Sequence, residues 1–207
     1  GAFNMITENM RGLIKNGATI RAMFEEGKEL ARKYGKENVY DFSLGNPNVE
    51  TPEEIKKLIC EIVSEEDSLN LHGYMSNSGY EDVRKTIANS INKKYELNID
   101  EQSIVMTCGA AGGLNIIFKS ILEEGDEVIV FAPFFGEYSN YIKNFKGKEV
   151  IASTEENTFL PDVEDLKRNI TERTKAVIIN SPNNPTGVVY SSKVIEDICF
   201  VLKQKQL

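Results

Sequence analysis

The sequence predicts an α/β fold in which helices flank a mostly parallel sheet, an incomplete three-layer αβα arrangement. Four short apolar runs rich in β-branched residues lie in the second half of the chain, and segments with helical spacing separate them. This alternation is typical of βαβ units. Because ligands bind beyond the carboxyl ends of parallel strands, the segments that follow the runs are the places to search for a site.

The N-terminal part predicts a helix and then an extended segment. Apolar residues at helical spacing predict the helix over residues 20–34. Residues 39–44 form a short extended piece, which ends at the Gly-Asn-Pro-Asn turn signal of residues 45–48.

Two more helices are predicted before the sheet. Thr51 can cap the first of them, Pro52 suits its first position, and Glu54 completes a capping box. A loop at residues 71–79 separates this helix from one over residues 80–95, whose apolar residues recur on one face.

The second half of the chain supplies the predicted strands and their connecting helices. The four strands are residues 103–107, 127–131, 149–152 and 175–180. The helices are expected from Leu114, in the aromatic segment through Tyr141, around Leu166 and from Ser192.

Composition and charge exclude several classes of protein. The 207 residues are 41% hydrophobic, which is enough for a packed core, and 24 Lys and Arg stand against 32 Asp and Glu. The net charge of −8 argues against non-specific nucleic-acid binding, and no apolar run reaches the length of a membrane span.

The cysteine and histidine content points to no metal site and no disulfide framework. Cys60, Cys108 and Cys199 are widely spaced, and His72 is the only histidine. Free thiols without a recognisable signal peptide indicate a cytoplasmic protein.

Residues 107–113, Thr-Cys-Gly-Ala-Ala-Gly-Gly, join the first predicted strand to a helix. Small side chains let an anion approach the backbone, where free N–H groups and the positive helix end would bind a phosphate. The segment matches neither GxGxxG nor GxxxxGK[ST], so it is neither a dinucleotide nor an ATP fingerprint. A tight turn with close helix–strand packing is the alternative interpretation, and Cys108 is expected to be buried beside the turn.

Two further segments follow predicted strands. Residues 132–138 place aromatic side chains after the second strand, where one ring could stack on a flat cofactor or fill the core. Residues 180–187, Asn-Ser-Pro-Asn-Asn-Pro-Thr-Gly, form a stiff loop after the fourth strand, in which Asn184 offers an amide donor. Two prolines and a glycine constrain this loop more than a generic turn requires, so it is the most specific signal in the chain.

Residues 184–187, Asn-Pro-Thr-Gly, resemble the NPTG motif of the aspartate aminotransferase superfamily of fold type I pyridoxal-phosphate enzymes. Residues 43–47, Ser-Leu-Gly-Asn-Pro, resemble that family's SxGxP segment, and residues 74–84 resemble its YxxxxGxxxLR stretch. The turn at Gly109 and the aromatic residues after Pro133 follow in the family's order. The resemblance extends over nearly the whole chain.

The resemblance implies a binding site for pyridoxal 5'-phosphate. The N–H groups around Gly109, Ala110 and Ala111 would hold the cofactor phosphate. Phe135 would stack on the pyridine ring, and Asn184 would form a hydrogen bond with the ring hydroxyl oxygen. The alternatives are a packed Phe135 and an Asn184 that only stabilises its turn.

The resemblance also implies shared sites in a homodimer. Tyr74 would reach the phosphate in the partner subunit, or it is simply a surface side chain. Gly45 would contact the substrate carboxylate through its backbone, and Asn184 would lie at the substrate as well as at the cofactor.

In the family, the NPTG loop is followed by an aspartate, a tyrosine, the lysine that forms a Schiff base with the cofactor, and arginines. None of these later motifs is found in this sequence. Residues 1–50 are therefore expected to be an N-terminal segment, and residues 51–207 to be part of a large cofactor-binding domain, truncated before the lysine region. No catalytic residue is assigned, and the chain by itself is expected to be inactive.

The function that the resemblance implies for the whole enzyme is transfer of an amino group from an L-amino acid to a 2-oxo acid, with an aspartate-like preference. A carbon–sulfur β-lyase of the same fold type is one alternative. The other is a non-catalytic, truncated chain that acts as a binding or dimerisation partner.

Overall fold

The computed structural model describes residues 5–42, 45 and 49–207. The chain divides into two compact units, Gly1–Met75 and Ser76–Leu207. The sequence predicted a domain boundary after residue 50. Residues 51–75, with the helices that they form, belong to the same compact unit as the N-terminal segment.

The first unit begins with a helix that is longer than predicted. α1 (Glu8–Tyr34) extends well before residue 20, because the Thr7 hydroxyl caps it by accepting a hydrogen bond of 3.2 Å from the N–H of Met10. Glycines in its first half lower helix propensity, so the sequence pattern did not predict the helical turns before residue 20. Gly35, with φ +88°, ends the helix.

A single 3-10 turn, η1 (Lys36–Asn38), follows α1. Residues 39–42, the described part of the predicted extended piece, form no strand. Residues 43–44 of that piece and residues 46–48 of the predicted turn lie outside the described residues.

Two helices complete the first unit, α2 (Glu53–Glu65) and the short α3 (Ser68–Leu71). The capping box predicted at α2 is wrong: Pro52 is the N-cap residue, and no side chain caps the helix. Thr51 therefore lies one position outside the cap, where its hydroxyl cannot serve the first turn.

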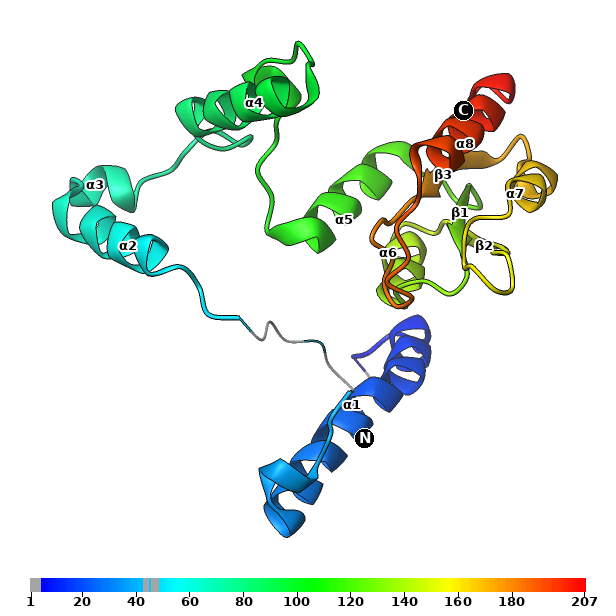
Figure 1. The fold of residues 1–207 in the computed structure, drawn as a ribbon, viewed down its shortest axis with the longest axis horizontal. Coiled ribbons are helices and arrows are strands. Elements are labelled where there is room, and N and C mark those ends of the chain that lie inside the picture. Colours follow the sequence, from blue (N-terminus) through cyan, green and yellow to red (C-terminus); the bar gives the residue numbers. More distant parts are fainter. Residues whose placement is uncertain (1–4, 43–44, 46–48) are drawn as a thin grey trace. The chain divides into compact units, whose positions relative to one another are not determined.

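The second unit contains a three-stranded parallel sheet and several helices (Figure 1). The strands are β1 (Glu127–Phe131), β2 (Lys148–Ala152) and β3 (Thr174–Ile178), in the order β2-β1-β3. Three of the four predicted strands are thereby confirmed. The helical elements are α4 (Glu81–Tyr95), η2 (Glu101–Ser103), α5 (Gly109–Ile121), α6 (Glu137–Asn144), α7 (Val163–Asn169) and α8 (Ser192–Gln204). Of these, α5, α6, α7 and α8 supply the side chains packed on the sheet.

The strand predicted over residues 103–107 is wrong. Residues 104–107 belong to no helix or strand, although the backbone of Ile104 is extended. A strand requires a neighbouring strand to bond with, and here the N–H of Met106 donates instead to the carbonyl of Ser78, at 2.9 Å. The apolar run predicted an extended backbone correctly but could not supply a partner.

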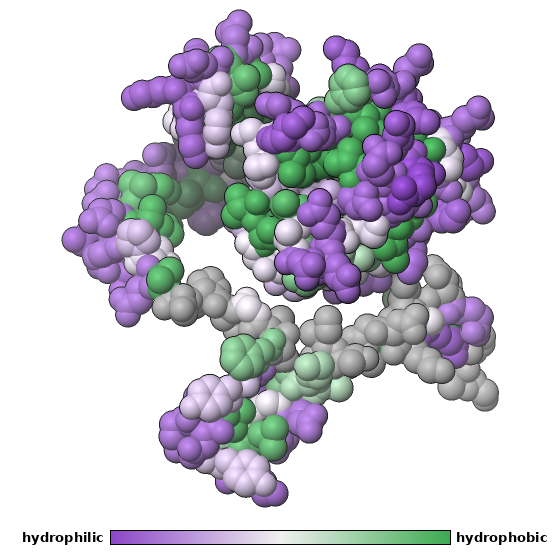
Figure 2. Space-filling model, turned by 45° about the vertical axis from the view of Figure 1, so that its right-hand side comes forward, coloured by the Kyte–Doolittle hydropathy of each residue, from purple (hydrophilic) through white to green (hydrophobic). Residues whose placement is uncertain are grey.

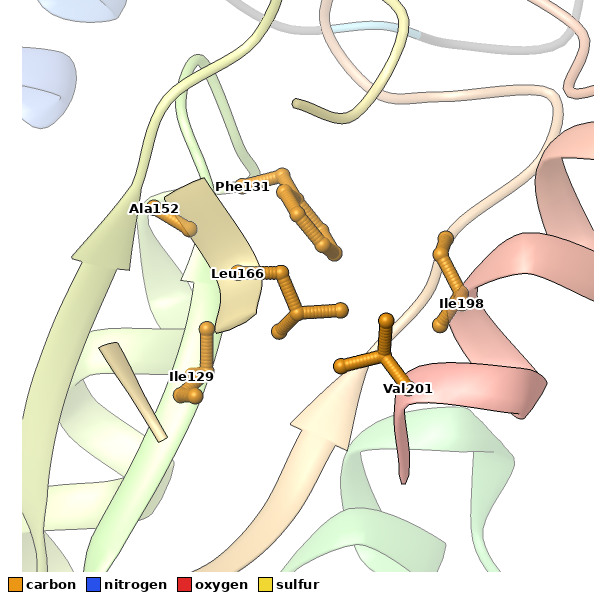
Figure 3. Close-up of a cluster of buried hydrophobic side chains, with 6 residues drawn as sticks. All are labelled: Ile129, Phe131, Ala152, Leu166, Ile198 and Val201. Atoms are coloured by element: carbon orange, nitrogen blue, oxygen red, sulfur yellow. The ribbon is translucent and has the colours of Figure 1, made fainter. Parts of the chain in front are cut away.

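The central strand is buried on both faces, because alternate side chains pack against different helix layers. Val128 and Val130 lie in one cluster with Phe118 of α5 and Ile142 of α6. The other cluster joins β1 to β2, α7 and α8, and its side chains converge in Figure 3. Its members are Ile129, Phe131, Ala152, Leu166, Ile198 and Val201. The predicted αβα layering is therefore confirmed in the second unit.

Apolar side chains also lie on the surface, as the green atoms in Figure 2 show. α2 has no buried residue. Five of its apolar side chains are between 40% and 64% exposed: Ile55, Leu58, Ile59, Ile62 and Val63. This exposed row on α2 matches the amphipathic pattern that predicted the helix.

Candidate functional site

The first turn of α5 presents unpaired backbone donors. Cys108 is the N-cap residue, but its side chain makes no capping hydrogen bond. Gly109, at φ +70°, donates its N–H to the carbonyl of Thr107 at 2.9 Å. The N–H groups of Ala110 and Ala111 have no acceptor among the residues that the structure describes. Two free donors at a helix N-terminus are able to bind an anion.

The small residues of this turn serve packing as well. A Cβ atom at Gly113 would lie 3.5 Å from Oγ1 of Thr107, and one at Gly112 would lie 3.7 Å from Cβ of Cys108. By contrast, a Cβ at Gly109 would meet no atom within 4 Å. The open side of the turn is therefore at Gly109. Cys108 is exposed, not buried as expected.

The aromatic segment after β1 divides its rings between the core and the surface. Phe134 packs against the cluster on the α5 and α6 side. Phe135 is 39% exposed, and its ring meets that of Tyr138 edge-on, with centroids 5.6 Å apart. Core filling is thus the role of Phe134, whereas Phe135 keeps a ring surface accessible.

The loop after β3 carries two adjacent asparagines with opposite environments. Asn183 is buried, and Asn184 is exposed. The backbone N–H of Asn184 donates to Oδ1 of Asn180 at 2.8 Å. The side-chain amide of Asn184 has no partner among the described residues, so it remains available to a ligand. The sequence motif pointed to Asn184 and missed Asn183, whose burial it does not encode.

A buried tyrosine connects this loop to the aromatic segment. The hydroxyl of Tyr190 accepts a hydrogen bond of 3.5 Å from Nδ2 of Asn183. Burial raises the pKa of Tyr190, the hydrogen bond from Asn183 opposes that shift, and the nearby Tyr138 adds to it. Tyr138 in turn contacts Phe135. Since β1 and β3 are neighbours, the segments that bear Phe135 and Asn184 leave the same end of the sheet.

Two predicted residues belong to the first unit. Tyr74 is fully exposed. Gly45 has open space where a side chain would begin, and the remaining residues of its SxGxP-like segment lie outside the described residues. The remaining predicted residues, Gly109, Ala110, Ala111, Phe135 and Asn184, all lie in the second unit.

Two kinds of feature are absent from the described part of the chain. It contains no group of three or more His, Cys, Asp or Glu side chains that could hold a metal ion. None of its helices combines the length and apolarity that crossing a membrane demands.

Known proteins resemble this chain over most of its length. Residues 37–207 match the model of the family described as aminotransferase class I and II. The aspartate aminotransferase of Pyrococcus horikoshii is 32% identical over 192 residues, which are 92% of this chain and 46% of that protein.

Solved structures agree with the sequence matches. An amino transferase from Eubacterium rectale is 37% identical, with a TM-score of 0.93 over 98% of this chain and 51% of that chain. Aspartate aminotransferase from Thermus thermophilus with maleate is 30% identical, with a TM-score of 0.78 over 89% of this chain and 47% of that chain. The chain spans about half the length of the relatives it matches. It belongs to the aminotransferase class I and II family, in which the aspartate aminotransferases depend on pyridoxal phosphate.

Proposed function

We propose that the whole protein is an aminotransferase that moves an amino group from an L-amino acid to a 2-oxo acid, and that this chain holds part of its cofactor site. The observation that carries the proposal is the pair of free N–H groups on α5, in the same unit as the exposed ring of Phe135 and the unpaired amide of Asn184. Similarity to named aspartate aminotransferases supports an aspartate-like substrate.

The residues present fit pyridoxal phosphate. The N–H groups of Ala110 and Ala111 would hold the phosphate, and Gly109 would contribute its open side rather than its N–H, which Thr107 occupies. Phe135 would stack on the pyridine ring, and Asn184 would donate to the ring hydroxyl oxygen. When bound, pyridoxal phosphate supplies the electron sink for chemistry at the amino acid's α-carbon.

The remaining roles follow from the family. The backbone of Gly45, together with Asn184, would bind the substrate carboxylate. Tyr74 would reach the phosphate of the partner subunit in a homodimer, and its full exposure is consistent with such a contact. The three free cysteines support a cytoplasmic location.

The 207 residues alone are proposed to lack transaminase activity. No lysine of this sequence stands in the family's lysine motif, so nothing here would attach the cofactor or move a proton at the substrate's α-carbon. Borohydride reduction of the chain with pyridoxal phosphate, followed by mass analysis, is expected to show no stoichiometric adduct at a single lysine. One such adduct would contradict this part of the proposal.

The phosphate site is tested by titrating the chain with pyridoxal phosphate and recording absorbance. Wild type is expected to saturate. Ala111→Glu is expected to weaken binding at least about tenfold, because it places a carboxylate beside the phosphate. A carboxylate in the first turn favours the helix itself, so this loss does not reflect unfolding.

Ala111→Gln is the size-matched neutral control: it adds the same bulk beside the phosphate without the charge, so it is expected to bind more tightly than Ala111→Glu. Equal affinities of the Glu and Gln variants would show that the phosphate binds elsewhere.

A further inference from the structure

We propose that Asn183 is a positioning residue, which fixes Asn184 so that its free amide meets the ring hydroxyl of the cofactor. The inference rests on the proposed function and names how that site is held. Asn183 is only 8% exposed, and the ligand is expected at Asn184, so Asn183 acts through its neighbour.

The side chain of Asn183 bonds to two later points of the same loop. Its Oδ1 accepts hydrogen bonds from both the N–H and the hydroxyl of Thr186, at 3.2 and 2.9 Å. Its Nδ2 donates to the hydroxyl of Tyr190 at 3.5 Å. The amide therefore ties the loop both across the turn and to the buried tyrosine.

The backbone of Asn183 closes the loop a second time. Its N–H donates to the carbonyl of Val188 at 2.9 Å, and its carbonyl accepts from the N–H of Gly187 at 2.8 Å. On the other side, Asn180 holds the N–H of Asn184 at 2.8 Å. The backbone of Asn184 is thus fixed from both directions, while its own side chain stays unbonded among the described residues.

There is a physical reason why Asn183 bonds within the loop while the side chain of Asn184 stays unbonded. A buried polar side chain costs free energy unless its hydrogen bonds are made, and Asn183 makes them with the loop itself. A loop held in one conformation before binding loses less entropy when the ligand arrives. Removal of Asn183 would leave Asn184 present but free to take several orientations.

The first test measures pyridoxal phosphate affinity and the absorbance of the bound cofactor for four variants of the chain. Asn184→Ala is expected to weaken binding about fivefold to tenfold, as the loss of one hydrogen bond between uncharged groups does. Asn183→Ala is expected to weaken it by a similar factor and to shift the absorbance maximum in the same direction as Asn184→Ala. The double variant is expected to bind like Asn184→Ala, because without Asn184 there is nothing left to position.

The matched control is Asn92→Ala. Asn92 also closes a loop with its side chain, by accepting from the N–H of Ile99 at 2.9 Å and donating to its carbonyl at 2.7 Å. This variant is expected to leave the affinity and the absorbance unchanged. Additive losses in the double variant, or an unshifted absorbance in Asn183→Ala, would reduce Asn183 to a purely structural residue and overturn the inference.

A second measurement needs no cofactor. Hydrogen exchange of the backbone amides of Asn184, Thr186 and Gly187 is expected to accelerate about tenfold or more in Asn183→Ala, while amides of β1 keep their rates. Unchanged exchange at these three amides would overturn the inference. Failure of wild type to bind pyridoxal phosphate, or an unaffected Asn184→Ala, would instead overturn the proposed function, and the exchange rates would still decide the role of Asn183.

Discussion

At the scale of single residues, Gly79 is required both by its backbone and by its neighbour. Its φ is +99°, and a Cβ atom would lie 2.4 Å from Cγ of Met106. We expect Gly79→Ala to lower the free energy of unfolding by about 1–3 kcal/mol. Urea unfolding of the chain, followed by circular dichroism, measures this change.

Gly136→Ala is the matched control for that experiment. Gly136 has φ −57°, which suits any residue, and no atom lies within 4 Å of its Cβ position. Its unfolding free energy is expected to stay within about 0.5 kcal/mol of wild type. If the two variants unfolded at the same urea concentration, the steric argument at Gly79 would be wrong.

The sequence predicted which residues belong to motifs, but it predicted only part of the contacts that these residues make. Arg84, the arginine of the YxxxxGxxxLR-like stretch, donates from Nε to the carbonyl of Gly79 at 3.2 Å and from its guanidinium to the carbonyl of Glu101. The glycine and arginine of this motif therefore shape one turn. Asn184 was likewise found from its motif. Asn183 could not be found, because its side chain is bonded to Tyr190, which the motif does not include.

At the scale of elements, Glu127 anchors the start of β1 and makes stability depend on pH. Hydrogen bonds from the hydroxyl of Thr171 and from Lys148 lower the pKa of the buried Glu127 below its ordinary 4.5. Because the pKa of Glu127 is lower in the folded state than in the unfolded state, its carboxylate stabilises the fold fully when the pH is above the unfolded-state pKa. This contribution is lost as the pH falls through the folded-state pKa.

Comparison with Glu127→Gln checks this pH dependence. The advantage of wild type in urea unfolding is expected to be full at about pH 7 and to shrink as the pH falls from about 5 towards 3. An advantage that stayed constant over this range would show that the carboxylate charge of Glu127 contributes nothing.

Element prediction succeeded where local pattern and burial coincide. β1 is a continuous apolar run because helices cover both of its faces, so its sequence alone identified it. The run at residues 103–107 has the same local pattern. It failed as a strand because strand formation depends on a neighbour elsewhere in the chain, which a window of sequence cannot contain.

At the scale of the whole molecule, the exposed apolar row on α2 favours self-association of the chain. We expect Leu58→Lys with Ile62→Lys to lower the associated fraction in sedimentation velocity. Thermal unfolding of the sheet-containing unit is expected to stay unchanged, because neither side chain belongs to either buried cluster.

The control for that pair is Glu54→Gln with Glu61→Gln. It alters the net charge of the same helix by the same amount but keeps every apolar side chain. Both pairs change the net charge from −8 to about −6, which weakens the repulsion between molecules, so the control is not expected to disperse the chain. If it dispersed the chain equally well, the change of charge on α2 would be the cause, and the exposed row on α2 would play no part.

The order of the strands along the chain determines which strand leaves the ribosome first. β1 is the centre of the sheet, yet it precedes both of its neighbours in the chain. Its α5 and α6 cover is complete once Ile142 is made, whereas the opposite cluster waits for Val201. At about 5–20 residues per second, that face of β1 stays uncovered for seconds. Ile129 and Phe131 are therefore the side chains that a chaperone would meet on the nascent chain.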